Sequence, residues 1–191
     1  MLIVKDIIKR KRMNKGILIF ILLLLGSALR SQSLHSEKII TVDGDTINLA
    51  VYSGKKIVFV VAPLFARDSL RIREVKKFQE KYKDSLQVIG IVSREDGYLD
   101  SNKSFVKSLY ATTGTGIILS APMYTRKAAG SNQSALMKWL TKKTINNFID
   151  TDCQGIFQTF FINTNGKLYA TLFPAIPLSS IIVKRTVELK H

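Results

Sequence analysis

The stretch GKKIVFVVAPLFARDSLRIREVKKF, residues 54–78, decides the fold. Its centre, IVFVVA at 57–62, is a continuous apolar run typical of a central strand buried on both faces, and Pro63 ends it. Apolar residues then recur near the helical period, which predicts an amphipathic helix from about Ser69, placed as its N-cap, to Lys83. The apolar positions of this helix are Ile72, Val75, Phe78 and Tyr82.

A second apolar run, at 86–92, follows the helix after a short turn. The resulting strand–helix–strand unit implies a parallel pair with a right-handed crossover. The remaining pattern predicts further elements: a hairpin at 41–49, helices at 100–110, 131–141 and 177–188, and strands at 157–162 and 168–173. Pro177 is expected at or near the first turn of the last helix. The predicted fold class is α/β, thioredoxin-like, with a central mixed sheet and helices on both faces.

The N-terminus has the pattern of an export signal. Basic residues dominate 5–15, and the apolar run ILIFILLLL follows at 17–25, shorter than the roughly 20 residues of a membrane span. We expect a signal peptide at 1–33, with Met13 as an alternative start, and a single domain at 34–191. The predicted location is exported, periplasmic or secreted. The alternative is an N-terminal membrane anchor, and either way the segment would contact the membrane at least transiently.

Charge favours an anionic partner without pointing to nucleic acid. The chain has 29 basic and 14 acidic residues, of which seven and one lie in residues 1–33, so the remainder carries 22 and 13, a formal net charge of +9. An excess of this size attracts anionic surfaces or acidic proteins. The interleaving of arginine with aromatic residues that marks nucleic-acid binders is missing, so no nucleic-acid partner is expected. An anionic envelope surface or a protein remains a candidate partner.

The single cysteine limits the chemistry that the chain can perform. Cys153 has no second cysteine with which to form an internal disulfide or resolve a sulfenic acid. Free cysteine packs as a small hydrophobe, so burial is expected, and the neighbouring Asp150 and Asp152 are expected to raise the thiol pKa. The two histidines, His35 and His191, stand near the ends of the predicted domain. No metal site and no cofactor are therefore expected.

Several segments, taken in order, resemble the glutathione peroxidase family. GKK at 54–56 followed by VVA at 60–62 is similar to the strand of that family that precedes its nucleophile. The other similar pieces are PMY at 122–124, Leu136 with Trp139 and Leu140, FQTFFINTNGK at 157–167, and FPAIP at 173–177. The resemblance covers about residues 40–189. It implies a thioredoxin-like fold and a thiol-dependent reduction of hydroperoxides, with glutathione or another thiol as reductant.

The resemblance also implies that this chain lacks the four catalytic residues of the family. The family's cysteine or selenocysteine falls on Phe65, its glutamine near Glu95, and its tryptophan–asparagine pair on Gly155 and Ile156. A thiolate is the nucleophile in this chemistry, and a phenyl ring cannot replace it. The expected function is a non-catalytic binding or structural module. The alternatives are a thiol peroxidase that uses Cys153 and a basic surface-binding protein whose fold is incidental.

Overall fold

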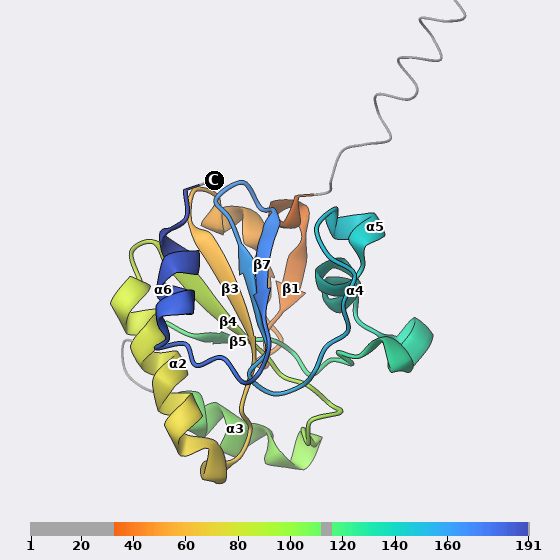
Figure 1. Cartoon of the computed structure of the whole chain (residues 1–191). Coiled ribbons are helices and arrows are strands. Elements are labelled where there is room, and N and C mark those ends of the chain that lie inside the picture. Colours follow the sequence, from red (N-terminus) through yellow and green to blue (C-terminus); the bar gives the residue numbers. More distant parts are fainter. Residues whose placement is uncertain (1–32, 112–115, 191) are drawn as a thin grey trace, which may run out of the picture. The chain divides into compact units, whose positions relative to one another are not determined.

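The computed structural model describes residues 33–111 and 116–190, so the predicted leader lies outside the described residues except for Ser33 (Figure 1). Its main element is a five-stranded sheet in the order β5-β4-β3-β6-β7. The strands are β3 Lys56–Val61, β4 Leu86–Ile91, β5 Ile118–Leu119, β6 Thr159–Ile162 and β7 Leu168–Leu172. Strand β3 is parallel to β4 and antiparallel to β6, so the sheet is mixed as predicted.

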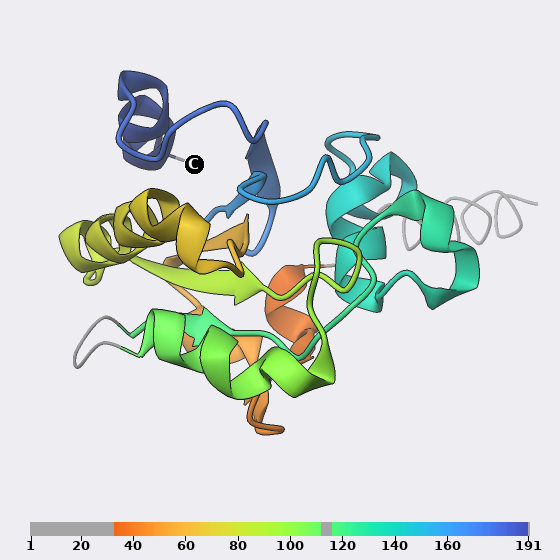
Figure 2. The same ribbon diagram turned by 90° about the horizontal axis from the view of Figure 1, so that it is seen from below.

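The central strand separates two hydrophobic layers. Its side chains alternate, so that Val58 and Val60 join one core cluster while Phe59 and Val61 join the other. Helices α2 Ser69–Tyr82, α3 Lys103–Tyr110 and α6 Ile181–Glu188 contribute to the first cluster. Helix α4 Ala135–Thr141 and the residues around α5 Lys143–Asn146 contribute to the second. Figure 2 shows α2 and α6 on one side of the sheet and α4 and α5 on the other. Helices on both faces are therefore confirmed.

A small hairpin lies outside this sheet. Strands β1 Lys38–Ile40 and β2 Thr46–Asn48 pair antiparallel, so the hairpin begins at residue 38 and ends at 48, where the prediction was 41–49. Gly44, with φ +96°, lies in the connecting turn, where a side chain would be strained. The backbone of Thr41 and Val42 then bonds to Asp45 and to Leu119, which ties the hairpin to the edge of the main sheet.

Several predicted boundaries are wrong, each for a local reason. Ser69 is the first residue of α2, because a short 3-10 turn at Ala66–Asp68 precedes it. Helix α6 begins at Ile181 with the Ser180 hydroxyl as its N-cap, so Pro177 lies before the helix and not in its first turn. The helix predicted at 131–141 begins only at Ala135, after a 3-10 segment at Lys127–Asn132 that contains Gly130 at φ +58°.

Strand β6 also starts later than the predicted residue 157. Phe157 has φ +76°, a left-handed conformation that is uncommon for a bulky side chain and that places it outside the strand. The strand partner β7 follows the predicted turn at Asn163–Gly166, where the Asn163 side chain accepts from the backbone N–H groups of Asn165 and Lys167. Within residues 33–111 and 116–190, no helix is both long and apolar enough to cross a bilayer.

Candidate functional site

Four loop segments meet beyond the carboxyl ends of the parallel strands β3 and β4. They are residues 63–66 after β3, residues 93–98 after β4, residues 123–127, and residues 153–157 before β6. The N–H of Phe157 donates to Val61 O at 2.7 Å, and the N–H of Arg94 donates to Met123 O at 3.0 Å. Ligand sites of open α/β sheets lie at this edge. All four degenerate positions of the family resemblance are on these segments.

Phe65 lies in the loop between strand β3 and helix α2. Its ring is half-buried, packs at the edge of the first core cluster, and lies against Gly97. The guanidinium of Arg67 covers the ring at 4.6 Å from its centroid. The backbone C=O of Phe65 accepts from the N–H of Asp68 at 2.9 Å, as the 3-10 turn before α2 begins. A phenyl ring therefore occupies this position, and it offers neither a proton nor a lone pair to a substrate.

Glu95 ties two of the loops together. Its Oε1 accepts from the backbone N–H groups of Thr125 and Arg126, both at 3.0 Å, and its Oε2 also accepts from the Thr125 N–H at 3.0 Å. The Ser93 hydroxyl adds a weaker bond at 3.3 Å. Partial burial, the largest influence, raises the pKa of Glu95, but the N–H donors of Arg126, Thr125 and Glu95 itself and the Ser93 hydroxyl outweigh it, so its pKa is lowered.

The ionised Glu95 carboxylate consequently acts as an acceptor only. An amide at this position would be able to donate a hydrogen bond to a sulfur or peroxide oxygen, whereas the carboxylate has no proton to give. Its oxygens are already engaged by backbone N–H groups of the facing loop. In the structure Glu95 anchors the loop after β4 to the loop at residues 123–127.

An ion pair that the sequence did not point to closes the site. Arg126 Nη2 donates to Asp96 Oδ1 at 2.7 Å, and the Asp96 side chain is only 8% exposed. Its other oxygen, Oδ2, is buried and has no hydrogen-bond partner among the described residues. Gly155, at φ +105°, lies against this pair, because a Cβ there would come within 3.1 Å of Asp96 Oδ1 and 3.3 Å of Arg126 Nη2. A tryptophan at this position would displace the ion pair.

The 153–157 segment crosses from one layer of the molecule to the other. Cys153 packs in the second core cluster with α4, whereas Phe157 packs in the first cluster with α2. Ile156, between them, is half-buried against the first cluster. The left-handed Phe157 places its ring beneath the Arg71 guanidinium, 4.3 Å from the ring centroid. The thiol and the start of α2 therefore belong to opposite faces of the sheet.

Cys153 is buried, 3% exposed, as the sequence predicted. Burial is the main cause that raises its pKa; a backbone hydrogen bond from Gly155 and a side-chain one from Thr125 oppose it. Asp96 raises the pKa and Arg126 lowers it, so the predicted influence of Asp150 and Asp152 is wrong. The Asp152 carboxylate instead accepts from the N–H groups of Cys153 and Lys127, at 2.7 and 2.8 Å. Asp150 pairs with the Lys127 ammonium.

The loops at this edge hold three of the four positions that the family resemblance singled out close to one ion pair. The arrangement brings Phe65, Glu95 and Gly155 to the same edge through Gly97, Asp96 and Arg126, and it keeps the thiol buried behind them. No cluster of three or more His, Cys, Asp or Glu side chains able to hold a metal occurs in the part of the chain that the structure describes. The contacts that the structure shows at this edge are the Asp96–Arg126 ion pair and the packing of Arg67 on the Phe65 ring.

Comparison with solved structures identifies the fold. The chain superimposes on Trgpx in its apo form with a TM-score of 0.62 and 15% identity, covering 84% of this chain and 98% of that one. For T. cruzi GPX1 the TM-score is 0.56 at 15% identity, with 80% and 94% covered. A thioredoxin-family thiol:disulfide interchange protein from Chlorobium tepidum gives 0.53 at 18% identity, with 83% and 97% covered. No protein-family model and no curated protein matches the sequence.

The first two of these structures are glutathione peroxidases. The chain therefore has a glutathione peroxidase and thioredoxin-like fold, as the order of its sequence motifs predicted. The match covers nearly the whole of the compared chains. At this level of identity it establishes the architecture alone.

Proposed function

We propose that the chain is an exported, thioredoxin-fold binding or structural module that does not reduce peroxides. The observation that carries this proposal is the phenyl ring of Phe65, packed against Gly97 and covered by Arg67, at the position where the family resemblance places the nucleophile. The chemistry needs an ionisable sulfur or selenium atom at the start of the helix, where backbone N–H groups stabilise its anion. The loss of that atom removes the first step.

The supporting positions favour the same proposal. Glu95 accepts hydrogen bonds in place of an amide that donates them, and Gly155 leaves room for the Asp96–Arg126 ion pair in place of an indole. Export is supported by the basic and apolar leader of the sequence, and a location in the periplasm or outside the cell follows from it.

The alternative function is a thiol peroxidase that uses Cys153. It is favoured by the position of the thiol near Arg126 and the N–H of Gly155, both of which lower its pKa. Burial and the raised net pKa oppose it, because the thiolate is the reactive form.

Peroxide turnover tests both proposals. Residues 34–191 are incubated with hydrogen peroxide or an organic hydroperoxide and with glutathione or reduced thioredoxin, and the loss of peroxide is followed. We expect the rate of the uncatalysed control for the wild type, for Cys153→Ser and for Phe65→Cys. Phe65→Cys should stay inactive, because Glu95, Gly155 and Ile156 offer no side-chain hydrogen-bond donors to support the new thiol. Enzymatic turnover by the wild type that Cys153→Ser abolishes would establish the alternative and overturn the proposal.

A further inference from the structure

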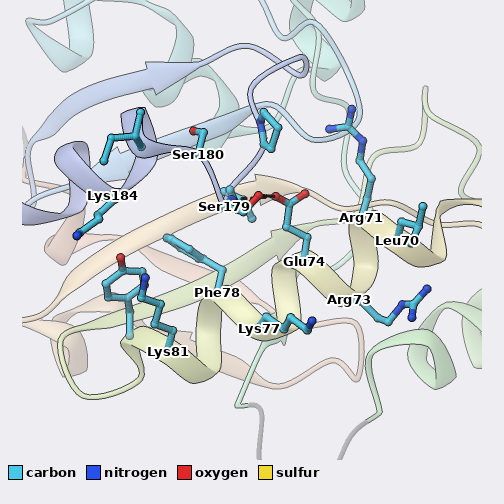
Figure 3. Close-up of a pocket in the computed structure, with 14 residues that line it drawn as sticks. Leu70, Arg71, Arg73, Glu74, Lys77, Phe78, Lys81, Ser179, Ser180 and Lys184 are labelled. Carbon is cyan, nitrogen blue, oxygen red and sulfur yellow. Dashed lines mark hydrogen bonds between the residues drawn. The ribbon is translucent and has the colours of Figure 1, made fainter.

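A groove of about 840 Å³ lies between helix α2 and the segment that leads into helix α6, and it shares Arg71 with the edge of the site described above. Figure 3 shows Glu74 and Phe78 of α2 pointing toward the side that carries Ser179 and Lys184. The groove is lined by apolar side chains of α2, of the first residue of α6 and of the segment before α6: Leu70, Phe78, Tyr82, Ile181 and Leu178. Leu70 is 73% exposed and Ile181 59% exposed, so these two residues present apolar surface to solvent.

The charges around the groove are almost all of one sign. Its lining includes five cations, Arg71, Arg73, Lys77, Lys81 and Lys184, and a single acidic residue, Glu74. Glu74 is already engaged, because its Oε1 accepts from the N–H and the hydroxyl of Ser179, both at 2.8 Å. Lys184 has only a long contact of 4.0 Å with Glu188 on its own helix. Arg71 also donates to the Pro174 carbonyl oxygen at 2.8 Å and covers the Phe157 ring. Among the residues that line the groove, five cations thus stand against one carboxylate.

We propose that this groove binds an acidic segment of a partner protein that carries bulky apolar side chains at helical spacing. Apolar side chains of the partner cover Phe78, Leu70 and Ile181, and its carboxylates face the lysines and arginines along the α2 edge. Grooves between helices take amphipathic helices in this way, with apolar anchors along one face and charges at the rim. Opposite charge at the rim also accelerates association.

A recessed floor favours a peptide over a flat anionic membrane. Phe78 is 5% exposed and Leu178 4% exposed, because both also pack in the first core cluster, so only a small part of each is reached from the groove between the exposed Leu70 and Ile181. A protruding side chain reaches that part, and a flat bilayer surface does not. The inference rests on the proposed binding role. The two proposals fail separately. Peroxide turnover would overturn the proposed lack of peroxidase activity, and it would not affect peptide binding in the groove.

The test uses a fluorescein-labelled synthetic helical peptide of leucine and glutamate, with leucines at i, i+3, i+4 and i+7. Fluorescence anisotropy measures its binding to the protein. We expect saturable binding that weakens as salt increases, and no binding of the matched peptide in which lysine replaces glutamate. Absence of binding by the glutamate peptide at low salt, or equal binding of both peptides, would overturn the proposal.

Two matched pairs of variants locate the binding. Lys77→Glu/Lys81→Glu should weaken binding by about 10-fold or more, while Lys76→Glu/Lys143→Glu, with the same change in net charge outside the groove, should change it by less than about 2-fold. Leu70→Ser/Ile181→Ser should likewise weaken binding, and Val51→Ser/Leu99→Ser, at apolar positions that are equally exposed, should not. Equal effects within either pair would show that the groove is not the site.

A second measurement separates a peptide from a membrane. Phosphatidylglycerol vesicles are sedimented with the wild type and with Lys77→Glu/Lys81→Glu. We expect little vesicle binding, and no loss of it in the variant. Vesicle binding that is tight and lost in this variant, together with a weak peptide signal, would assign the groove to a membrane surface and overturn the proposal.

Discussion

The ring of Phe65 lies so close to Gly97 that a Cβ built on that glycine would come within 2.5 Å of the ring's Cζ atom. Gly97 also has φ +101°, a conformation that side chains rarely adopt. The contact joins the loop after β3 to the loop after β4 at the position to which the sequence resemblance assigns the family's nucleophile. The size of Phe65 and the absence of a side chain at residue 97 therefore depend on each other.

A double-mutant cycle tests this dependence. Gly97→Ala should destabilise the protein through both backbone strain and the clash with the ring, whereas in a Phe65→Ala background only the strain remains. We expect a coupling of about 0.5–3 kcal/mol between the two substitutions in urea unfolding. Additive effects would show that the ring moves aside freely.

Replacement of Glu95 tests its anchoring role. In Glu95→Gln the amide group faces the N–H donors of Thr125 and Arg126, and the variant should lose about 1–3 kcal/mol of unfolding free energy at pH 7. Glu80→Gln is the control, because Glu80 is exposed and pairs only with Lys83 across one helical turn. Its effect should be close to zero.

The same carboxylate gives a pH dependence of known sign. Because the pKa of Glu95 is lowered in the folded protein, its contribution is complete above the unfolded value of about 4.3 and is lost as the pH falls through the lower folded pKa. The stability difference between wild type and Glu95→Gln should therefore be constant from pH 7 to about pH 5 and narrow below it. A difference that widens on acidification would contradict the direction of the shift.

Gly155 should tolerate no side chain. Gly155→Ala combines a φ of +105° with crowding of the Asp96–Arg126 pair, while Gly44→Ala has a similar φ of +96° but no neighbour within 4 Å of the added Cβ. Both should be destabilised by about 1 kcal/mol through the backbone, and Gly155→Ala by clearly more, measured by thermal or urea unfolding. Equal losses of unfolding free energy in the two variants would mean that the Asp96–Arg126 pair moves aside for the added methyl group at no energetic cost.

The thiol of Cys153 should be unreactive in the native state. Burial raises its pKa and limits access, so its reaction with Ellman's reagent at pH 7 should be at least about 100-fold slower than in guanidinium chloride. Mass spectrometry after treatment with hydrogen peroxide should find the residue unmodified. Rapid labelling of the folded protein would instead point to an open route to the sulfur.

The central strands were predictable because a short, continuous run of apolar residues, ended by a proline or a turn, is typical of a strand buried on both faces. IVFVVA at 57–62 is apolar at every position, and its alternation between two core clusters follows directly from the pleat of a strand. The family resemblance assigned Phe65, Glu95 and Gly155 to one site, and in the structure all three lie on loops at one edge of the sheet. The boundaries near Ser69 and Pro177 were missed because short 3-10 and turn segments compete with the helix there.

Two features of the site were not predictable. Asp96 and Arg126 are 30 residues apart and belong to no motif, so their spacing in the sequence does not predict an ion pair. The left-handed Phe157 was also missed, since a phenylalanine beside an apolar strand is ordinarily counted as part of it. Both depend on how loops meet in space, which periodicity does not report.

The presence of a single cysteine, buried at the start of the 153–157 segment, also bears on how the chain matures. Since no cystine forms within it, acquisition of the native structure requires neither an electron acceptor nor a disulfide isomerase. The folded state should be indifferent to the redox potential of its surroundings, and the same conformation should be reached with or without dithiothreitol.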